Sequence, residues 1–405
     1  MISVEDATRR ILSACPLLPA ETVSLSQAAG RVLATDVAAR RMQPPCDVSA
    51  MDGYAVRAGD CAKVPVELKM VGEAPAGGLF QGELEAGTAV RIFTGGPVPP
   101  GADSIILQED TEADGTRITV QEAPSYGQHI RRTGIDFAEG EVMLRAGRRL
   151  SPFDIGLLAS MNVPWVRVQR RPRVALLATG DELVMPGETP GPAQVISSNS
   201  IALKALCASA GAETTDLGIA ADNRTALASL AEGAAGHDVL VTIGGASVGD
   251  RDLVKQVLGE GGLDIDFWKI AMKPGKPLIF GQFQDALMLG LPGNPVSALV
   301  CALLYLAPAL RRMQGIEDAL PKTRTAVLGC DLPANKARQD YLRSKLVKQS
   351  DDALVATPYD VQDSSMLSKL SAAKALVIRP PEAPAAKAGD EVEVIPLTGF
   401  ADSAF

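Results

Sequence analysis

The sequence contains very little histidine, with only His129 and His237 among 405 residues. Its six cysteines are scattered, and no two of them form a Cys-x-x-Cys pair. Histidine-rich metal centres, zinc clusters and a Ser-His-Asp triad are therefore poor interpretations of this chain. The cysteine pattern does not suggest a disulfide framework either, and it suits a reducing compartment.

Two nucleotide-binding motifs are also missing. No Gly-x-x-x-x-Gly-Lys-[Ser/Thr] occurs, which excludes a P-loop NTPase. No Gly-x-Gly-x-x-Gly opens the part of the chain where strands and helices alternate, which argues against a dinucleotide-dependent oxidoreductase. The net charge of −9 argues against general nucleic-acid binding.

Long hydrophobic runs are absent as well. The longest, residues 296–310, is too short to span a bilayer and contains Ser297 and Pro308, and the first residues show no signal pattern. We therefore expect a soluble, cytoplasmic protein that uses neither membrane nor nucleic acid. Hydrophobic residues still make up 46% of the chain. A chain of this length has enough of them for the cores of about two to four domains.

Strands and helices alternate between residues 170 and 315, which favours a mostly parallel sheet with helices on both faces. Earlier in the chain, residues 3–15 have helical periodicity, residues 24–35 suit a second short helix, and residues 64–122 are rich in β-type segments. After Pro321, short β-type segments recur between glycines and prolines. They predict an all-β module of roughly 80 residues, either a barrel or a sandwich.

The most distinctive stretch is residues 239–252. An apolar strand-like run ends at Gly244 and Gly245, which permit a tight turn and close approach of the backbone to a ligand. Ser247 follows, and acidic residues that include Asp252 open a helix. A glycine turn at a helix N-terminus suits an anion, and the carboxylates suit a divalent cation bound beside it. We therefore predict a site for a phosphorylated, metal-bridged ligand.

Five unusual loops are expected at the same edge of the sheet, because ligands bind outside the carboxyl ends of parallel strands. They are residues 180–182, 222–223, 244–247, 273–277 and 292–297. Their carboxylates, lysines, hydroxyls and turn amides describe a phosphate or oxyanion site with Mg²⁺, since zinc prefers histidine and thiol ligands. Each loop taken alone is more simply a turn with a capping acid or a solvated lysine. It is the convergence of five that favours a site.

Several of these stretches resemble, in order, the motifs of the molybdopterin molybdenumtransferases, a bacterial family similar to the E domain of gephyrin. The resemblance covers nearly the whole chain. Its motifs here are residues 49–55 (Ser-Ala-Met-Asp-Gly-Tyr-Ala), 93–103 (Phe-Thr-Gly-Gly-Pro-Val-Pro-Pro-Gly-Ala-Asp), 178–183 (Ala-Thr-Gly-Asp-Glu-Leu), 244–250 (Gly-Gly-Ala-Ser-Val-Gly-Asp), 273–277 (Lys-Pro-Gly-Lys-Pro) and 290–297 (Gly-Leu-Pro-Gly-Asn-Pro-Val-Ser).

The resemblance implies a multidomain α/β plus β fold in an elongated homodimer. It implies a discontinuous helical N-terminal region (residues 1–43 and 138–168), a β-rich insertion (44–137), a central three-layer α/β molybdopterin-binding domain with a mostly parallel sheet (169–318) and a C-terminal β-barrel (319–405). The implied reaction inserts molybdenum from molybdate into adenylylated molybdopterin and releases AMP, with Mg²⁺ as cofactor. We further expect contact with the adenylyltransferase and with proteins that mature molybdoenzymes.

Carried over to this sequence, the family's motifs imply three groups of site residues. The implied catalytic residues are Asp52, Thr94, Glu182, Lys273 and Lys276. The implied metal ligands are Asp222 and Asp252, with Glu182 in support. The implied substrate-binding residues are Gly244, Gly245, Ser247, Lys269, Pro292, Pro295, Ser297, Arg131, Arg343 and Ser364.

Of these, Asp52, Thr94 and Arg131 would belong to a cleft shared with the partner subunit. From the residues alone, Arg131 and Arg132 beside Gly134 fit a solvated basic turn as well as an anion clamp.

The sequence departs from the family pattern at four positions outside the core loops, namely Cys46, Val48, Ile135 and Ile243. Two alternatives therefore remain beside the insertase. One is a non-catalytic molybdopterin-binding or scaffold paralogue. The other is the preceding enzyme, a molybdopterin adenylyltransferase, although no nucleotide motif supports it.

Overall fold

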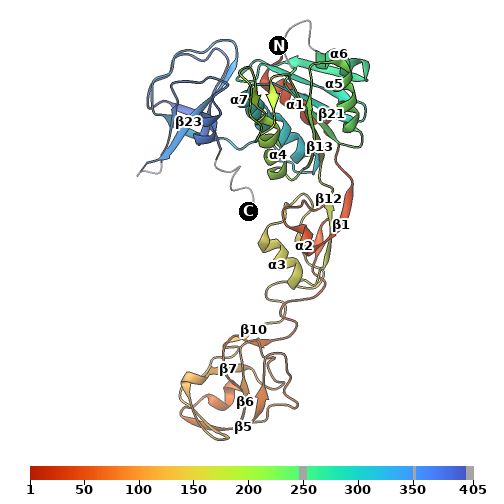
Figure 1. Cartoon of the computed structure of the whole chain (residues 1–405). Coiled ribbons are helices and arrows are strands. Elements are labelled where there is room, and N and C mark those ends of the chain that lie inside the picture. The colour runs from red at the N-terminus through yellow and green to blue at the C-terminus, as the bar shows by residue number, and fades with distance from the viewer. Residues whose placement is uncertain (246–252, 350–352, 398–405) are drawn as a thin grey trace.

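The computed structural model describes residues 1–245, 253–349 and 353–397. The chain is elongated (Figure 1). A β-rich lower region lies at one end, a small middle region joins it to an α/β domain, and a C-terminal barrel lies beside the α/β domain. This is the multidomain α/β plus β architecture that the sequence predicted.

The α/β domain is built on a six-stranded sheet in which four neighbouring strands pair in parallel and two further strands complete one side through antiparallel pairings. In spatial order the strands are β16 (Glu213–Ala220), β13 (Arg173–Thr179), β17 (Val239–Ile243), β21 (Ala286–Leu291), β20 (Pro277–Phe283) and β18 (Leu263–Lys269). Because β18 runs against β20, and β20 against β21, β18 has the same direction as the four parallel strands. Its carboxyl end therefore lies at the same edge as theirs.

Both faces of this sheet are buried, because successive strand side chains point to opposite sides. In β13, Val174 and Leu176 belong to one core cluster, whereas Ala175 and Leu177 belong to another. The helices α5 (Arg224–Ala231) and α6 (Leu253–Glu260) cover the second cluster. Burial of each large apolar side chain stabilises the fold by roughly 1.5–3 kcal/mol.

The first cluster is covered by α4 (Asn199–Ser209), by a long helix near residue 300 and by α1 (Val4–Ala14). Although α1 belongs to the N-terminal part of the chain, it packs on the α/β domain through Ala7 and Ile11. The physical reason is its amphipathic pattern, which presents a single apolar face to the nearest large core.

The long helix joins α7 (Pro295–Cys301), a π-helical turn, η4 (Ala302–Leu306), and α8 (Ala307–Met313). It is longer than the apolar run seen in the sequence. Pro308 lacks the N–H that would complete the α-helical ladder, which accounts for an irregular turn just before it. By length and composition this helix could cross a membrane, but 83% of its most apolar window is buried inside the protein. It has the character of a core helix.

The middle region is a small mixed unit around α3 (Pro152–Ser160). Ser151 and Asp154 form a capping box at the start of α3. The strand pairs are β1 (Ala20–Ser24) with β12 (Trp165–Gln169) and β2 (Val37–Ala38) with β11 (Val142–Leu144). The helix expected over residues 24–35 is a single turn, α2 (Leu25–Ala28), since Gly30 takes a positive φ of 74° and ends it.

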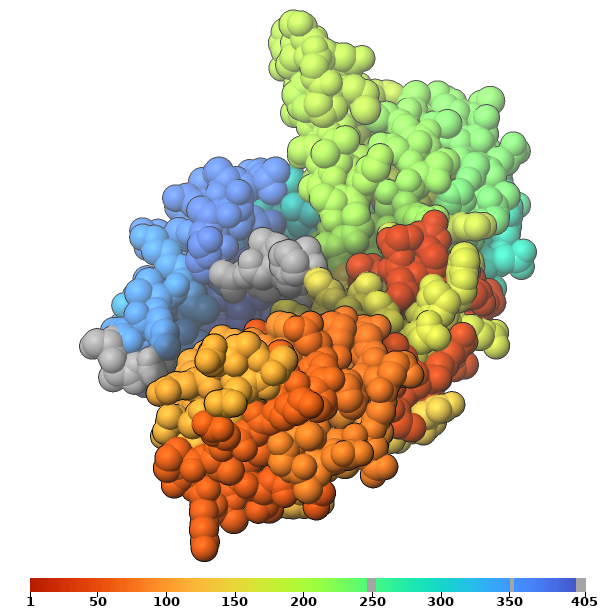
Figure 2. Space-filling model, turned by 90° about the horizontal axis from the view of Figure 1, so that it is seen from below, coloured from red at the N-terminus to blue at the C-terminus, as the bar shows by residue number. Residues whose placement is uncertain are grey.

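The lower region holds another six-stranded sheet, as its β-rich sequence predicted. Its strands in spatial order are β7 (Ser104–Leu107), β4 (Gly53–Val56), β6 (Thr88–Ile92), β5 (Val66–Ala74), β9 (Arg117–Val120) and β8 (Thr111–Asp114). A further short pair joins β3 (Val48–Ser49) to β10 (Ile130–Arg131). Seen from below, this region lies in front of the rest of the molecule (Figure 2).

The C-terminal module is a closed barrel rather than a sandwich. Its strands β23 (Gln339–Lys348), β24 (Leu354–Pro358), β22 (Arg324–Leu328), β26 (Glu391–Pro396) and β25 (Ala375–Arg379) pair in this order, and β25 pairs back to β23. A short strand of the α/β domain, β19 (Met272–Lys273), adds to β23 and ties the two domains together.

The loop that carries β19 is held against the long helix by Gly275. Its φ is 103°, and a Cβ built on it would lie 2.4 Å from Cys301 Sγ. Only glycine tolerates both the backbone conformation and the contact. The position of the Lys-Pro-Gly-Lys loop therefore depends on an atom-level fit between Gly275 and α7.

We expect Gly275→Ala to destabilise the α/β domain by about 2 kcal/mol or more, through left-handed strain and overpacking. Thermal unfolding followed by circular dichroism measures this. The matched control is Gly259→Ala in α6, where a Cβ meets open space. That change should leave stability equal or raise it by up to about 1 kcal/mol. Equal midpoints for the two variants would contradict the prediction.

Candidate functional site

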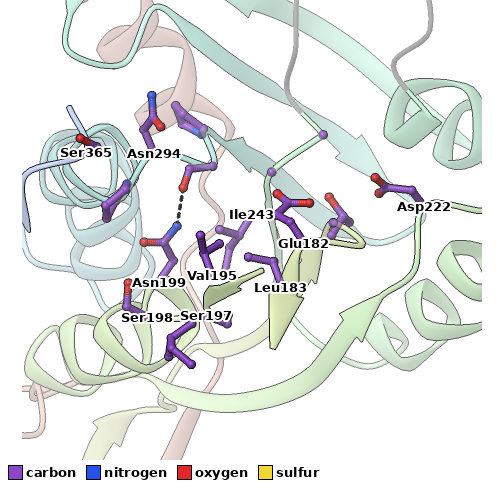
Figure 3. Close-up of a pocket in the computed structure, with 18 of the residues that line it drawn as sticks. Glu182, Leu183, Val195, Ser197, Ser198, Asn199, Asp222, Ile243, Asn294 and Ser365 are labelled. Carbon is purple, nitrogen blue, oxygen red and sulfur yellow. Dashed lines mark hydrogen bonds between the residues drawn. The ribbon is translucent and has the colours of Figure 1, made fainter. Parts of the chain in front are cut away.

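A cavity of about 900 Å³ opens at the carboxyl edge of the α/β sheet (Figure 3). It is lined by the loops that follow β13, β16, β17 and β21, and by Pro277 at the start of β20. All five predicted loops therefore reach this edge. Among the predicted residues, those in the lining are Glu182, Asp222, Gly244, Gly245, Pro292 and Pro295.

One side of the cavity is acidic. Glu182 folds back over Gly180, so that a Cβ on Gly180 would lie 2.5 Å from a Glu182 carboxylate oxygen. The loop after β16 is fixed to this segment because the backbone N–H of Asp222 donates to Asp181 Oδ1 over 2.9 Å. Partial desolvation, together with the nearby carboxylates of Asp181 and Glu182, raises the pKa of Asp222. A cation bound beside these three carboxylates would reduce their mutual repulsion.

These carboxylates can supply part of a Mg²⁺ coordination shell but not all of it. Among the described residues, no three His, Cys, Asp or Glu side chains converge closely enough to hold a metal ion by themselves. Mg²⁺, however, commonly uses one or two carboxylates and takes its other ligands from water and substrate phosphates. Glu182 and Asp222 supply oxygen donors of that kind, and their mutual repulsion is what a divalent cation would relieve.

The glycine turn after β17 is shaped by close packing. Gly244 and Gly245 have φ values of 88° and 63°, and a Cβ on either would lie 2.7 Å or less from a neighbouring atom, Thr179 O or Val254 Cγ2. Side chains are thus excluded here, which keeps the backbone open to the cavity. The predicted site residues Ser247 and Asp252 lie outside the described residues.

On the opposite side, the Pro-Gly-Asn-Pro loop is held from two directions. Asn199 Nδ2 donates to the carbonyl of Gly293 over 2.7 Å (Figure 3). Asn294 Nδ2 donates to Ser364 Oγ over 3.0 Å, and the N–H of Val296 donates to the Ser364 carbonyl. The C-terminal domain thus contacts this loop through Ser364. The predicted Ser297 is buried in the first turn of α7.

Arg343 supports this contact from inside the barrel. Its side chain is almost fully buried, which lowers its pKa, and it donates to Gln362 Oε1 and to the Met366 carbonyl. Met366 lies two residues after Ser364, so the buried guanidinium fixes the loop that meets Asn294. Ser365 from the same loop lines the cavity.

The predicted lysines do not line this cavity. Lys273 lines a second cavity in the barrel, because its strand β19 pairs with β23 opposite Asp340. Lys269 places its ammonium 3.7 Å from the ring centroid of Trp268. Lys276 lies in the loop between β19 and β20 and is partly buried. The loop of residues 273–277 reaches the cavity through Pro277, whereas the lysine side chains do not line it with the carboxylates.

The three remaining predicted residues lie in the lower region, away from the cavity of the same chain (Figure 1). Asp52 accepts hydrogen bonds from the N–H and hydroxyl of Thr94 over 2.6 and 2.8 Å, which lower the pKa of its carboxyl. Arg131 is exposed in β10. Its neighbour Arg132 pairs with Asp47 over 2.6 Å.

Sequence reasoning missed part of the cavity wall. Asn199 is one such residue: its Oδ1 is buried without a partner among the described residues, and its amide binds the Pro-Gly-Asn-Pro loop. It also missed a projecting arm formed by β14 (Leu183–Val184) and β15 (Val195–Ile196), of which Leu183, Val195 and Ile196 line the cavity. This yellow-green part of the chain projects from the α/β domain in Figure 2. The glycines and prolines between the two strands concealed the pairing.

Comparison with known proteins matches family models along most of the chain. Residues 2–162 match the MoeA N-terminal region (domains I and II), residues 175–312 a probable molybdopterin binding domain, and residues 325–397 the MoeA C-terminal region (domain IV). The molybdopterin molybdenumtransferase of Haemophilus influenzae is 35% identical over 98% of this chain and 99% of its own. The chain belongs to the molybdopterin molybdenumtransferase family.

Further relatives agree with this membership. The molybdopterin molybdenumtransferase of a Nostoc species is 38% identical over 85% of this chain and 82% of its own. The crystal structure of a molybdopterin biosynthesis MoeA protein from Pyrococcus horikoshii has a TM-score of 0.83 at 31% identity, and covers 98% of this chain and 99% of that one. The described cavity lies largely within the region that matches the molybdopterin-binding model of this transferase family.

The crowding at Asp222 predicts a pH-dependent stability. The pKa of Asp222 is higher in the folded than in the unfolded protein, so the folded state favours the protonated carboxyl. Its contribution to the free energy of unfolding is full at a pH below the unfolded-state pKa and is lost as the pH rises through the folded-state pKa. In metal-free buffer at pH 7, Asp222→Asn should therefore unfold at a higher temperature than the wild type, and the difference should shrink toward pH 4. Asp264→Asn, at the far end of β18, is the control. An equal gain in both variants, or one independent of pH, would contradict the assignment.

Proposed function

We propose that this protein inserts molybdenum from molybdate into adenylylated molybdopterin, with release of AMP, during molybdenum cofactor biosynthesis. The observation that carries the proposal is the cavity of five convergent loops inside the region that matches the molybdopterin-binding model, in a chain 35% identical to a molybdenumtransferase over nearly its full length. The names of the relatives supply the substrate class, and the cavity supplies groups that suit it.

The cavity has complementary sides for such a substrate. The glycine turn at Gly244 and Gly245 exposes backbone beside the carboxylates, where a phosphoanhydride would lie. The unpartnered Oδ1 of Asn199 is an acceptor for an N–H group, as a pterin ring offers. Leu183, Val195 and Ile243 add apolar surface on which a ring can rest. These groups bind and orient the substrate.

Mg²⁺ is part of the proposal, with Asp222 and Glu182 of the described residues as its ligands. When bound, it would neutralise charge on the phosphoanhydride and stabilise the negative charge that develops when AMP leaves. The carboxylates would in turn be relieved of their repulsion. Asp252 remains a proposed third ligand.

Molybdate is a tetrahedral dianion and needs positive charge and hydroxyl donors. We place it between the α/β domain and the barrel, where Lys273 and Lys276 lie on one loop and Ser364 meets the Pro-Gly-Asn-Pro loop. In this arrangement Arg343 positions Ser364 rather than touching the anion, because its guanidinium already donates inside the barrel. Lys269 and Ser297 contribute from the edges of the same region.

A homodimer completes the proposal. Asp52, Thr94 and Arg131 lie in the lower region, away from the cavity of their own chain (Figure 1). They can contribute to the reaction only at the cavity of a second copy. The proposal also includes work in the cytoplasm, which the six free cysteines suit, and contact with the adenylyltransferase that supplies the substrate.

The decisive assay mixes purified protein, adenylylated molybdopterin, Mg²⁺ and molybdate, and measures AMP. We expect AMP release that depends on molybdate, and a loss of at least 100-fold in Asp222→Asn because the metal loses a ligand. Asp264→Asn is the matched control and should be near wild type. Tight substrate binding without AMP release would indicate a carrier or scaffold instead, and AMP release independent of molybdate would exclude the insertase.

Sharing of the site between subunits predicts complementation. Asp52→Asn and Lys276→Ala should each be nearly inactive alone. When the two are dissociated and reassociated together, mixed dimers contain one site with both native residues, so up to about a quarter of wild-type activity should return for random pairing. Recovery is measured by AMP release. No recovery in a mixture whose mixed dimers are verified by mass spectrometry would contradict the shared site.

A further inference from the structure

The barrel contains a cavity of its own, of about 610 Å³. Residues 330–342, residues 358–362 and Arg379 form most of its wall, and Lys273 enters from the α/β domain. It shares no lining residue with the larger cavity at the sheet edge. It is therefore a separate space, which the proposed reaction uses only through Lys273.

Positive charge gathers in this barrel pocket, in a chain whose net charge is −9. Its basic lining residues are Lys273, Lys336, Arg338 and Arg379, and its acidic ones are Asp331, Asp340 and Asp360. Asp331 is already paired with Lys387 outside the lining, over 2.8 Å. Arg379 donates to the carbonyl of Pro384. The cations thus outnumber the acids that remain for them.

Within the described part of the chain, three of these cations form no ion pair with an acid, namely Lys273, Lys336 and Arg338. One of the pocket's carboxyls, Asp340, is half-buried. Its burial raises its pKa, while Lys273, Arg338 and Arg379 act in the opposite direction. Asp340 and Asp360 are the acids that remain for four cations, so the pocket is short of negative charge. An anionic ligand would supply it.

The pocket also offers groups for the non-ionic part of a ligand. Asn335 uses its Nδ2 to donate to the carbonyls of Arg338 and Pro380, over 3.1 and 2.7 Å. Its Oδ1 is buried and has no partner. Leaving a buried acceptor without a donor is costly, about 1–3 kcal/mol, unless a ligand provides one. Tyr359 adds an aromatic ring to the wall.

We propose that this barrel pocket binds a nucleotide-sized phosphate monoester. The phosphate is held by Lys336 and Arg338 with help from Lys273, and the organic part lies against Tyr359 and donates to Asn335 Oδ1. The volume is in the range of small-molecule sites and is much larger than an inorganic oxyanion fills. Charge and size together select an organic phosphate rather than a free oxyanion.

The test measures binding of AMP, as the probe, to the full-length protein by isothermal titration calorimetry without pterin or molybdate. The variant is Lys336→Glu with Arg338→Glu. The matched control is Arg324→Glu with Lys345→Glu, which makes the same charge change at exposed barrel positions outside the pocket. We expect AMP to bind the wild type and the control alike, and at least tenfold more weakly to the pocket variant. Thermal unfolding of both variants verifies that the barrel is folded.

Three results would overturn the proposal. The first is the absence of AMP binding to the wild type. The second is AMP binding that the pocket variant retains, which would place the ligand in the cavity at the sheet edge. The third is inorganic phosphate binding as tightly as AMP, which would leave no role for Tyr359 and Asn335. Molybdate-dependent AMP release is measured separately, so failure of this proposal and failure of the proposed function are distinguishable.

Discussion

The structure depends above all on strands β13 and β17, which are buried on both faces and fixed side by side. Their side chains alternate between two apolar cores, so each strand needs helices above and below the sheet. In a parallel sheet covered in this way, the carboxyl ends of the parallel strands lie at one edge, and the loops that follow them lie outside the core. The cavity exists because five such loops, unusual in composition, leave the sheet together.

Acidic and basic side chains lie on different sides of that cavity. The carboxylates of Glu182 and Asp222 lie together on one side, where partial desolvation and the charges of Asp181 and Glu182 raise the pKa of Asp222 and make the site favourable for a cation. The basic residues gather instead toward the barrel, where β19 carries Lys273 across to β23. In the proposed reaction, an anionic substrate between the two sides would meet the bound Mg²⁺ at one end and lysines at the other. This separation keeps acids and lysines from neutralising each other.

The barrel is therefore more than an appendage. It supplies Ser364 to the Pro-Gly-Asn-Pro loop, and the buried Arg343 fixes the segment that carries this serine. The lower region has the opposite relation to the cavity, since it lies away from it in the same chain (Figure 1). The barrel meets the cavity within the subunit, and in the proposed homodimer the lower region would reach the cavity of a second subunit.

The sequence by itself determined the parallel α/β sheet, the β-rich lower region, the C-terminal β-module and the loops that form the cavity. These follow from local signals, because apolar alternation and glycine or proline turns are written in consecutive residues. Gly244 and Gly245 are the plainest case, since both take a positive φ that glycine adopts without steric cost, and the glycine pair is visible in the sequence.

Only the tertiary structure decided which side chains of those loops lie together at the cavity. Lys273 is separated from Glu182 because a strand pairing more than sixty residues away along the chain draws it to the barrel. Asn199 became a cavity residue because Gly293 comes within reach of its amide, and α1 joined the α/β core because that was the largest apolar surface nearby. Such contacts join residues distant in sequence, and no local pattern encodes the distance between them.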